Sequence, residues 1–168
     1  MACNPSNTGH KIWLVNGFNP QDACFIIDDG QVVQNQSFVL SRLMVNAGKL
    51  TNPVVRLDFT CIVFFESEDE EGPEHEVEVD LLFKLIRVQE GNAEVLRTFR
   101  YLYEVDVENG IGELEVEMSE SFAFSYTDRP CPRCSEYLVV VEGRDFEGEF
   151  DALRVVSPHL SAIVQGIG

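Results

Sequence analysis

The sequence predicts an all-β fold: a single-domain antiparallel β-sandwich of jelly-roll type with an extended N-terminal connector. Segments rich in Val, Ile and Phe alternate apolar and polar residues along most of the chain. Turn signals separate these segments about every 8 to 15 residues, which is typical of sandwiches and jelly rolls. No segment of about ten residues has the period of an amphipathic helix. We therefore assign residues 1–10 to a polar connector and residues 11–168 to one folded domain.

Three short strands are predicted at the start of the domain. Residues 11–16 form an apolar run that contains the only Trp, and the turn sequence Asn16-Gly17 ends it. Residues 23–27 form a second apolar run of strand length. Residues 37–46 suit either a strand or a short helix, and the β-rich surroundings favour the strand.

Two long alternating segments are predicted to form a central hairpin. In residues 54–65 the odd positions are apolar, and in residues 76–88 they are apolar from Val77 to Leu85, so each segment has one face suited to a core. The acidic sequence 66–74, which contains Gly-Pro, joins the two segments.

A second hairpin is predicted from residue 94 onward. The apolar face of its first strand, residues 94–107, comprises Val95, Phe99, Tyr101, Tyr103, Val105 and Val107. Asn109-Gly110 is a strong hairpin signal, and the strand at 114–126 then has its apolar residues on even positions. Glu120 falls on that apolar face, so we expect a bulge near Ser119 to Ser121.

The C-terminal part is predicted to return against these hairpins as three more strands. A Cys-x-x-Cys turn precedes a Val-rich strand at 137–142, and a turn follows over Gly143 to Gly148. Strands at 150–156 and 159–165 complete the domain, which gives about nine or ten strands in total.

The composition excludes several functional classes. Acidic residues (29) outnumber Lys and Arg (12), which gives a formal net charge of -17 and a pI near 4.3. Such a charge repels the phosphates of nucleic acids and of anionic bilayers. No apolar run approaches about 20 residues, the length that a membrane-spanning helix needs. We therefore expect no nucleic-acid partner and no membrane span.

Catalysis has few candidate residues in this sequence. The three histidines, His10, His75 and His159, stand far apart in the chain. No Gly-x-Ser-x-Gly elbow, Walker loop or His-Glu-x-x-His motif occurs. We expect neither an enzyme nor a cofactor.

The acidic stretch 66–74 indicates an alternative function. Together with the carboxylates on neighbouring strands, it supplies the oxygen ligands that Ca²⁺ prefers. The Asp-x-Asp-x-Asp-Gly spacing is absent, and alternating acidic residues also keep an exposed strand face soluble. We expect no metal site, and we keep a monomeric calcium- or ligand-binding β-sandwich as the alternative.

The five cysteines offer the remaining chemistry. Cys131 and Cys134 suit half a zinc site, a redox dithiol or a disulfide, and the lack of further ligands or of a following helix favours a disulfide or structural thiol. Cys61 lies on a predicted core face, so we expect it to be buried and unpaired. The remaining cross-link candidates are Cys3, Cys24, Cys131 and Cys134. Cys3 lies in the connector, where it can reach a neighbouring subunit.

The cellular location has two interpretations. The N-terminus lacks the basic and apolar segments of a secretory signal, whereas disulfides form in oxidising surroundings. One interpretation is a cytosolic protein with reduced thiols. The other is a protein made inside a cell and exposed when that cell lyses, as spore-surface proteins are.

Four stretches of the chain resemble a known family. They are Leu50 to Phe59, Ser121 to Phe124, Cys131-x-x-Cys134-x-x-Tyr137-x-Val139-x-Val141 and Leu160 to Gln165. They resemble the domain of unknown function 4489 of clostridia and related spore formers, over roughly residues 50–165.

In layout the chain is also similar to the endospore-appendage subunits of bacilli, which are small jelly rolls without a signal peptide. That resemblance implies fibres that grow by strand addition between subunits and are cross-linked by disulfides. It implies that residues 1–10 are a connector with Cys3 as the cross-linking thiol. The acceptor would be Cys24, Cys131 or Cys134.

These observations favour a structural subunit of a self-assembling extracellular or spore-surface filament. Its partner is another copy of itself, in a helical homopolymer that grows by strand addition. Polar tails are mobile unless a partner holds them, so we expect a neighbouring subunit to contact the tail and the apolar run that follows it. The subunit-interface candidates are Ile12, Trp13, Leu14 and Val15.

Overall fold

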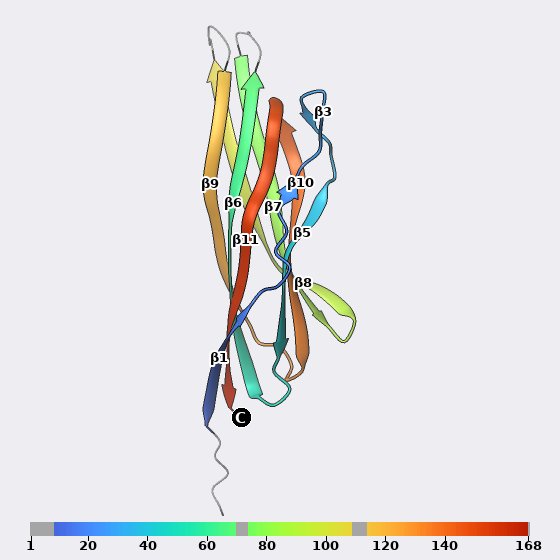
Figure 1. Ribbon diagram of the computed structural model, residues 1–168, viewed down its shortest axis with the longest axis vertical. Helices are drawn as coiled ribbons and strands as arrows, with labels where there is room; N and C mark the ends of the chain where they lie inside the picture. Colours follow the sequence, from blue (N-terminus) through green and yellow to red (C-terminus); the bar gives the residue numbers. More distant parts are fainter. Residues whose placement is uncertain (1–8, 70–73, 109–113, 168) are drawn as a thin grey trace, which may run out of the picture.

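The computed structural model describes residues 9–69, 74–108 and 114–167 and shows an elongated all-β molecule (Figure 1). Two antiparallel sheets pack face to face around one apolar core, which confirms the predicted antiparallel β-sandwich. Within these described ranges there is no helix, and therefore none long and apolar enough to cross a membrane.

The first sheet, called sheet A, has the strand order β1-β11-β6-β9. Its strands are β1 (His10–Asn16), β11 (Glu149–Ile167), β6 (Thr51–Asp69) and β9 (Leu114–Asp128). The short strand β2 (Ala23–Cys24) also pairs with β11. Each neighbouring pair in sheet A is antiparallel, so β1 and β9, at its two edges, run in opposite directions.

The second sheet, called sheet B, has the strand order β5-β10-β7-β8. Its strands are β5 (Ser37–Asn46), β10 (Cys134–Glu147), β7 (Glu74–Gln89) and β8 (Asn92–Glu108). A small separate hairpin contains β3 (Ile27–Asp28) and β4 (Gln31–Val32). From β5 onward, the chain changes sheet at every connection except β7 to β8, and the two strand orders fit the predicted jelly roll. The two predicted hairpins are wrong, because β6 and β7 lie in different sheets, as do β8 and β9, and β7 instead pairs with β8.

The period-two pattern fills the core as predicted. The odd positions of β6 and β7 point inward and are buried, from Val55 to Phe65 and from Val77 to Leu85. Aromatic rings connect the sheets, and the rings of Phe99 in β8 and Phe124 in β9 stack with their centroids 3.9 Å apart. Cys61 is buried and free, as predicted, and its burial raises the pKa of the thiol to about 12.

The bulge predicted near Ser119 to Ser121 is wrong. β9 pairs with β6 in one unbroken register from Asp128 to Leu114. Glu120 stays on the inward face without a bulge because it lies at the open side of the sandwich, exposed to solvent, and accepts a hydrogen bond from the Tyr101 hydroxyl at 3.2 Å.

The predicted inward face of 94–107 is wrong at Val95. The register between β7 and β8 shifts at Leu85/Ile86, which leaves Leu96 as an extra residue in β8. Leu96 packs against the core, and Val95 is 51% exposed as a result.

Three predicted boundaries also differ from the structure. The run 23–27 is not one strand but is divided between β2 and β3. The turn predicted over Gly143 to Gly148 is confined to Gly148, because β10 continues past Gly143 through a register shift. Gly148 has a φ of 103°, a backbone conformation that suits glycine. The strands predicted at 150–156 and 159–165 are one strand, β11, with an irregularity between Val156 and His159. The Asn109-Gly110 turn lies outside the described residues.

Candidate functional site

The outer edge of β9 is a long, regular and open strand edge. All 15 residues of β9 pair with β6 on one side, and no strand pairs with its other side among the described residues. The exposed side chains on its outer face are Glu115, Glu117, Ser119, Ser121, Ala123, Ser125 and Thr127. β9 has no Lys, no Pro and no bulge, three of the devices that prevent an edge strand from pairing with another chain, and its charges near the acidic end are those of Glu115, Glu117 and the inward-facing Glu120.

The opposite edge of sheet A is β1. β1 pairs with β11 from His10↔Ile167 to Asn16↔Ser161, and its other side has no strand partner within the described ranges. The predicted interface residues of β1 therefore separate into two pairs. Ile12 and Leu14 project outward and are 68% and 75% exposed, whereas Trp13 and Val15 are partly buried against the core.

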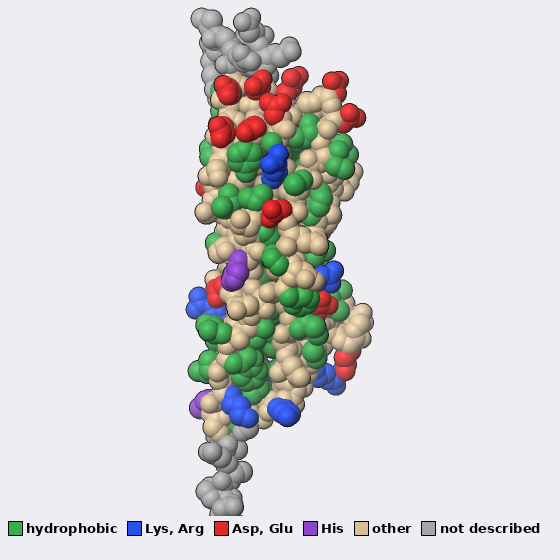
Figure 2. Space-filling model, viewed as in Figure 1, with side chains coloured by type: hydrophobic (Ala, Val, Ile, Leu, Met, Phe, Trp, Pro, Cys, Tyr) green, Lys and Arg blue, Asp and Glu red, His purple; other side chains and the backbone are tan. Residues whose placement is uncertain are grey.

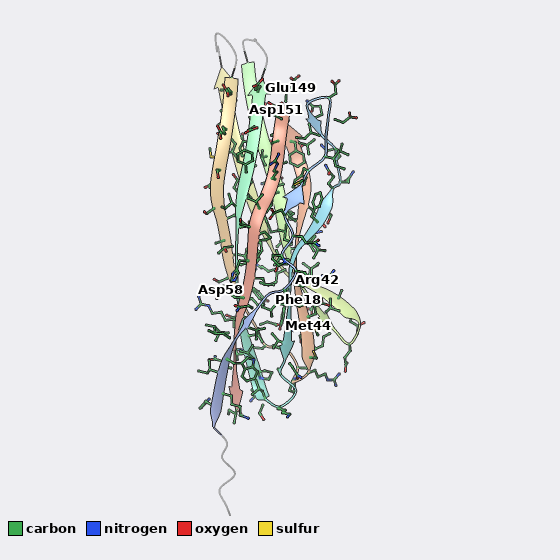
Figure 3. All side chains as sticks on the ribbon, in the orientation of Figure 1. Phe18, Arg42, Met44, Asp58, Glu149 and Asp151 are labelled. Atoms are coloured by element: carbon green, nitrogen blue, oxygen red, sulfur yellow. The ribbon has the colours of Figure 1, made fainter. Side chains whose placement is uncertain are left out.

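The edges of sheet B are less available for strand addition. The chain at 18–21 follows β5, where Phe18 N donates to Arg42 O at 2.8 Å and Gln21 N donates to Leu40 O at 2.8 Å; Figure 3 labels Phe18 and Arg42. β8 carries the register shift at Leu96. Sheet A thus has the two regular open edges, and sequence reasoning identified only the β1 edge.

An ion-pair network holds the C-terminal end of β9. The Asp128 carboxylate, in a residue that is 7% exposed, accepts hydrogen bonds from Arg87 Nη1 at 2.9 and 3.0 Å and from the Tyr137 hydroxyl at 2.9 Å. Burial, followed by the charge of Asp128, raises the pKa of Tyr137. Because Arg87 lies in β7 and Tyr137 in β10, this network fixes β9 of sheet A to sheet B.

The candidate cross-linking cysteines are exposed thiols where the structure describes them. Cys24 lies in β2, Cys131 in the turn after β9, and Cys134 at the start of β10. All three are free, so the intrachain disulfide favoured for Cys131 and Cys134 is not formed in this structure. Cys3, and with it most of the predicted connector, lies outside the described residues.

One end of the molecule is covered by carboxylates (Figure 2). We call this surface the acidic end; it comprises Glu66, Glu68, Glu76, Glu78, Glu104, Asp106, Glu115, Glu117, Asp145, Glu147, Glu149 and Asp151. The carboxylate oxygens of Glu76, Glu78 and Glu147 lie within 4.8 Å of one another, a spacing that can hold a cation. This cluster lies on β7 and β10 and not in the 66–74 stretch, of which residues 70–73 lie outside the described residues.

Crowding of like charges changes the acidity of this cluster. A hydrogen bond with Glu147, followed by the charge of Glu147, raises the pKa of Glu76 above its ordinary value of 4.5. Desolvation, followed by the charge of Asp145, raises the pKa of Glu78. Carboxyl groups with raised pKa values stabilise the fold when protonated, so this contribution is present below about pH 4.5 and is lost as the pH rises through the raised values.

Replacing Glu147 by Gln is therefore expected to stabilise the protein at neutral pH. The substitution removes a charge next to Glu76, so the melting temperature at pH 7 should rise by on the order of 2 °C, with no gain near pH 4. Thermal unfolding followed by circular dichroism at both pH values measures this difference. The control is Glu136→Gln, which removes a carboxylate paired with Arg42 at 3.1 Å and should give no gain. An equal gain in both variants would contradict the repulsion at Glu147.

Comparisons with known proteins identify a family but no activity. The family model described as a domain of unknown function (DUF4489) matches residues 25–165, which confirms the resemblance of the C-terminal motifs. No curated protein matches the sequence. One similar solved structure is described as "Structure of infectious bursal disease virus Gx strain"; it has 10% sequence identity and a TM-score of 0.40, and the match covers 95% of this chain. The chain spans only 32% of that structure's length, and the likeness is too weak to bear on function.

Proposed function

Because the chain belongs to the DUF4489 family, whose function is unknown, we propose a function from its own surfaces. We propose that it is a structural subunit of a self-assembling filament, placed outside the cell or on a spore surface, and that it acts mechanically and not as an enzyme. The observation that carries this proposal is that, within residues 9–69, 74–108 and 114–167, no strand covers the outer edge of β1 or of β9 in sheet A.

The directions of the two edge strands favour open-ended growth. β1 and β9 are antiparallel to each other within sheet A. If a second copy in the same orientation lies beside the first, β1 of one copy meets β9 of the other as an antiparallel pair. Such an interface joins two different surfaces, so each added copy leaves one free β1 edge and one free β9 edge. The copies form a ring if the rotation between them closes, and otherwise they form an open-ended filament.

The side chains at the two edges suit such a pairing. Ile12 and Leu14 are apolar and exposed in β1, and the exposed face of β9 carries the small residues Ser121, Ala123 and Ser125, which would not obstruct a strand added at that edge. Burial of apolar surface and a new ladder of backbone hydrogen bonds would both stabilise the contact.

Disulfides between copies would make an assembled filament resistant to dissociation. The exposed thiols of Cys24, Cys131 and Cys134 are the acceptors that this proposal assigns to Cys3 of a neighbouring connector. A covalent link between copies restrains the unfolded state of each chain and prevents subunit loss. Such a link needs an oxidising environment, which supports a location outside the cell.

The test is negative-stain electron microscopy of the oxidised protein with non-reducing gel electrophoresis. We expect long fibres and a ladder of cross-linked species that collapses to monomer with a reductant. The variant Cys3→Ser should keep the fold and the fibres, but those fibres should dissolve in denaturant without a reductant. Dispersed monomers of the native sequence would refute the filament, and undiminished resistance in Cys3→Ser would refute the cross-link.

A second candidate function, a monomeric calcium-binding β-sandwich, is favoured by the close carboxylates of Glu76, Glu78 and Glu147. In that case millimolar Ca²⁺ should raise the melting temperature of a protein that stays monomeric, and Glu147→Gln should abolish the increase. Fibres whose formation does not depend on Ca²⁺ would favour the filament over this candidate.

A further inference from the structure

The charges of the molecule are separated along its long axis. The strand ends that form the acidic end, at 66–68, 76–78, 104–106, 115–117 and 145–151, contain no Lys or Arg. Figure 2 shows these carboxylates gathered at one end of the molecule, and Glu149 and Asp151 are labelled at that end in Figure 3. Most of the Lys and Arg side chains visible in Figure 2 lie further along the molecule, toward the end where β1 begins, although a basic side chain also lies just below the acidic end.

The opposite end is hollowed and basic. Two adjoining depressions of about 520 and 340 Å³ share Thr51, Asn52 and Val54 in their walls and together form one groove. Arg129 lines the first depression and Lys11 the second, and Lys49 precedes the lining residue Leu50. None of these three cations has a carboxylate partner among the described residues.

We propose that this groove is the docking site for the acidic end of a second copy, so that copies also stack end to end along the long axis. The proposal rests on the filament proposed above, in which strand addition joins copies into rows. Docking then joins the acidic end of a copy in one row to the basic groove of a copy in another. Unpaired cations in the groove and crowded carboxylates at the acidic end give complementary charges, which select the partner and its orientation.

The two kinds of contact differ in their response to salt. Charge attraction is screened over about 10 Å at 0.1 M salt and over about 3 Å at 1 M, so end-to-end docking should weaken as salt is added. Backbone pairing between β1 and β9 is not an attraction between charged groups and should persist. High salt is therefore expected to leave rows of subunits that no longer stack.

A charge-exchange experiment tests the docking without requiring a fibre. Lys11→Glu with Arg129→Glu reverses the two cations that line the groove, and Glu149→Lys with Asp151→Lys reverses two of the twelve carboxylates of the acidic end. Both pairs are made in the full chain with Ser121→Lys and Ala123→Lys, which block the β9 edge. Sedimentation velocity at about 50 mM salt should show association of the edge-blocked parent and at least about tenfold weaker association of each reversed variant alone. An equimolar mixture of the two reversed variants should restore the association.

The outcomes separate this docking from the filament. Restored association in the mixture supports the docking, even if the native sequence forms no fibres and the filament fails. A mixture that associates no better than its components overturns the docking, even if fibres form by strand addition. A parent that remains monomeric at low salt also overturns it and leaves the groove to an acidic partner of another kind.

Discussion

Replacing Asp128 by Ala should lower the free energy of unfolding by about 3 kcal/mol, because it breaks a mostly buried ion pair and leaves Arg87 with a single, exposed carboxylate partner. Asp128 accepts two hydrogen bonds from Arg87 and one from Tyr137, and no other described carboxylate reaches the Tyr137 hydroxyl. Arg87 keeps only its contact with the exposed Glu94 at 2.6 Å. Chemical denaturation followed by tryptophan fluorescence measures the change.

Two milder substitutions distinguish the charge from the hydrogen bonds. Tyr137→Phe removes one hydrogen bond and should cost about 1 kcal/mol, and Asp128→Asn should fall between this variant and Asp128→Ala. A loss for Asp128→Ala no greater than that for Tyr137→Phe would contradict a structural role for the ion pair.

Lysines on the β9 edge should inhibit fibre formation while leaving the fold intact. In Ser121→Lys with Ala123→Lys, the new charges stand on the β9 edge that β1 of a neighbour would join, and charged edge strands resist pairing. We expect the protein concentration needed for fibres to rise at least about tenfold. Pelleting and electron microscopy measure this concentration, and circular dichroism checks the fold.

The matched control for this edge variant is His159→Lys. His159 pairs with Thr60, which pairs with Ala123, so the control adds a lysine at the same level of sheet A but in an interior strand. Fibres should form normally in the control. Equal inhibition by both variants would mean that charge on the sheet face, and not the β9 edge, controls assembly.

The alternation of apolar and polar residues predicted most of the strands, because a strand that buries one face in a core must have apolar residues at every second position. The odd residues of 54–65 are buried in β6, as expected for a strand with one face in a core. Pro158 gave a misleading signal of a strand break. It is tolerated within β11 because it lies in the irregularity between Val156 and His159, where the pairing with β6 is interrupted.

The features that sequence analysis missed depend on contacts between distant residues. Whether an edge is open follows from strand order, and the sequence does not show that β9 is at an edge whereas β6 is not. The pairing of Arg87 with Asp128 joins residues of different sheets, and neither residue has a sequence signal of burial. The shift that turns Val95 outward likewise depends on the register between two strands.

The central position of β11 has a consequence for synthesis of the chain. β11 follows every other strand in chain order, yet it lies between β1 and β6 and is the partner of β1. While a ribosome is still translating residues 149–167, β1 has no sheet to join, and the two edges of sheet A are not yet parts of one surface. A nascent chain therefore cannot present the β1 and β9 edges of one completed sheet until β11 has left the ribosome and paired with β6 and β1.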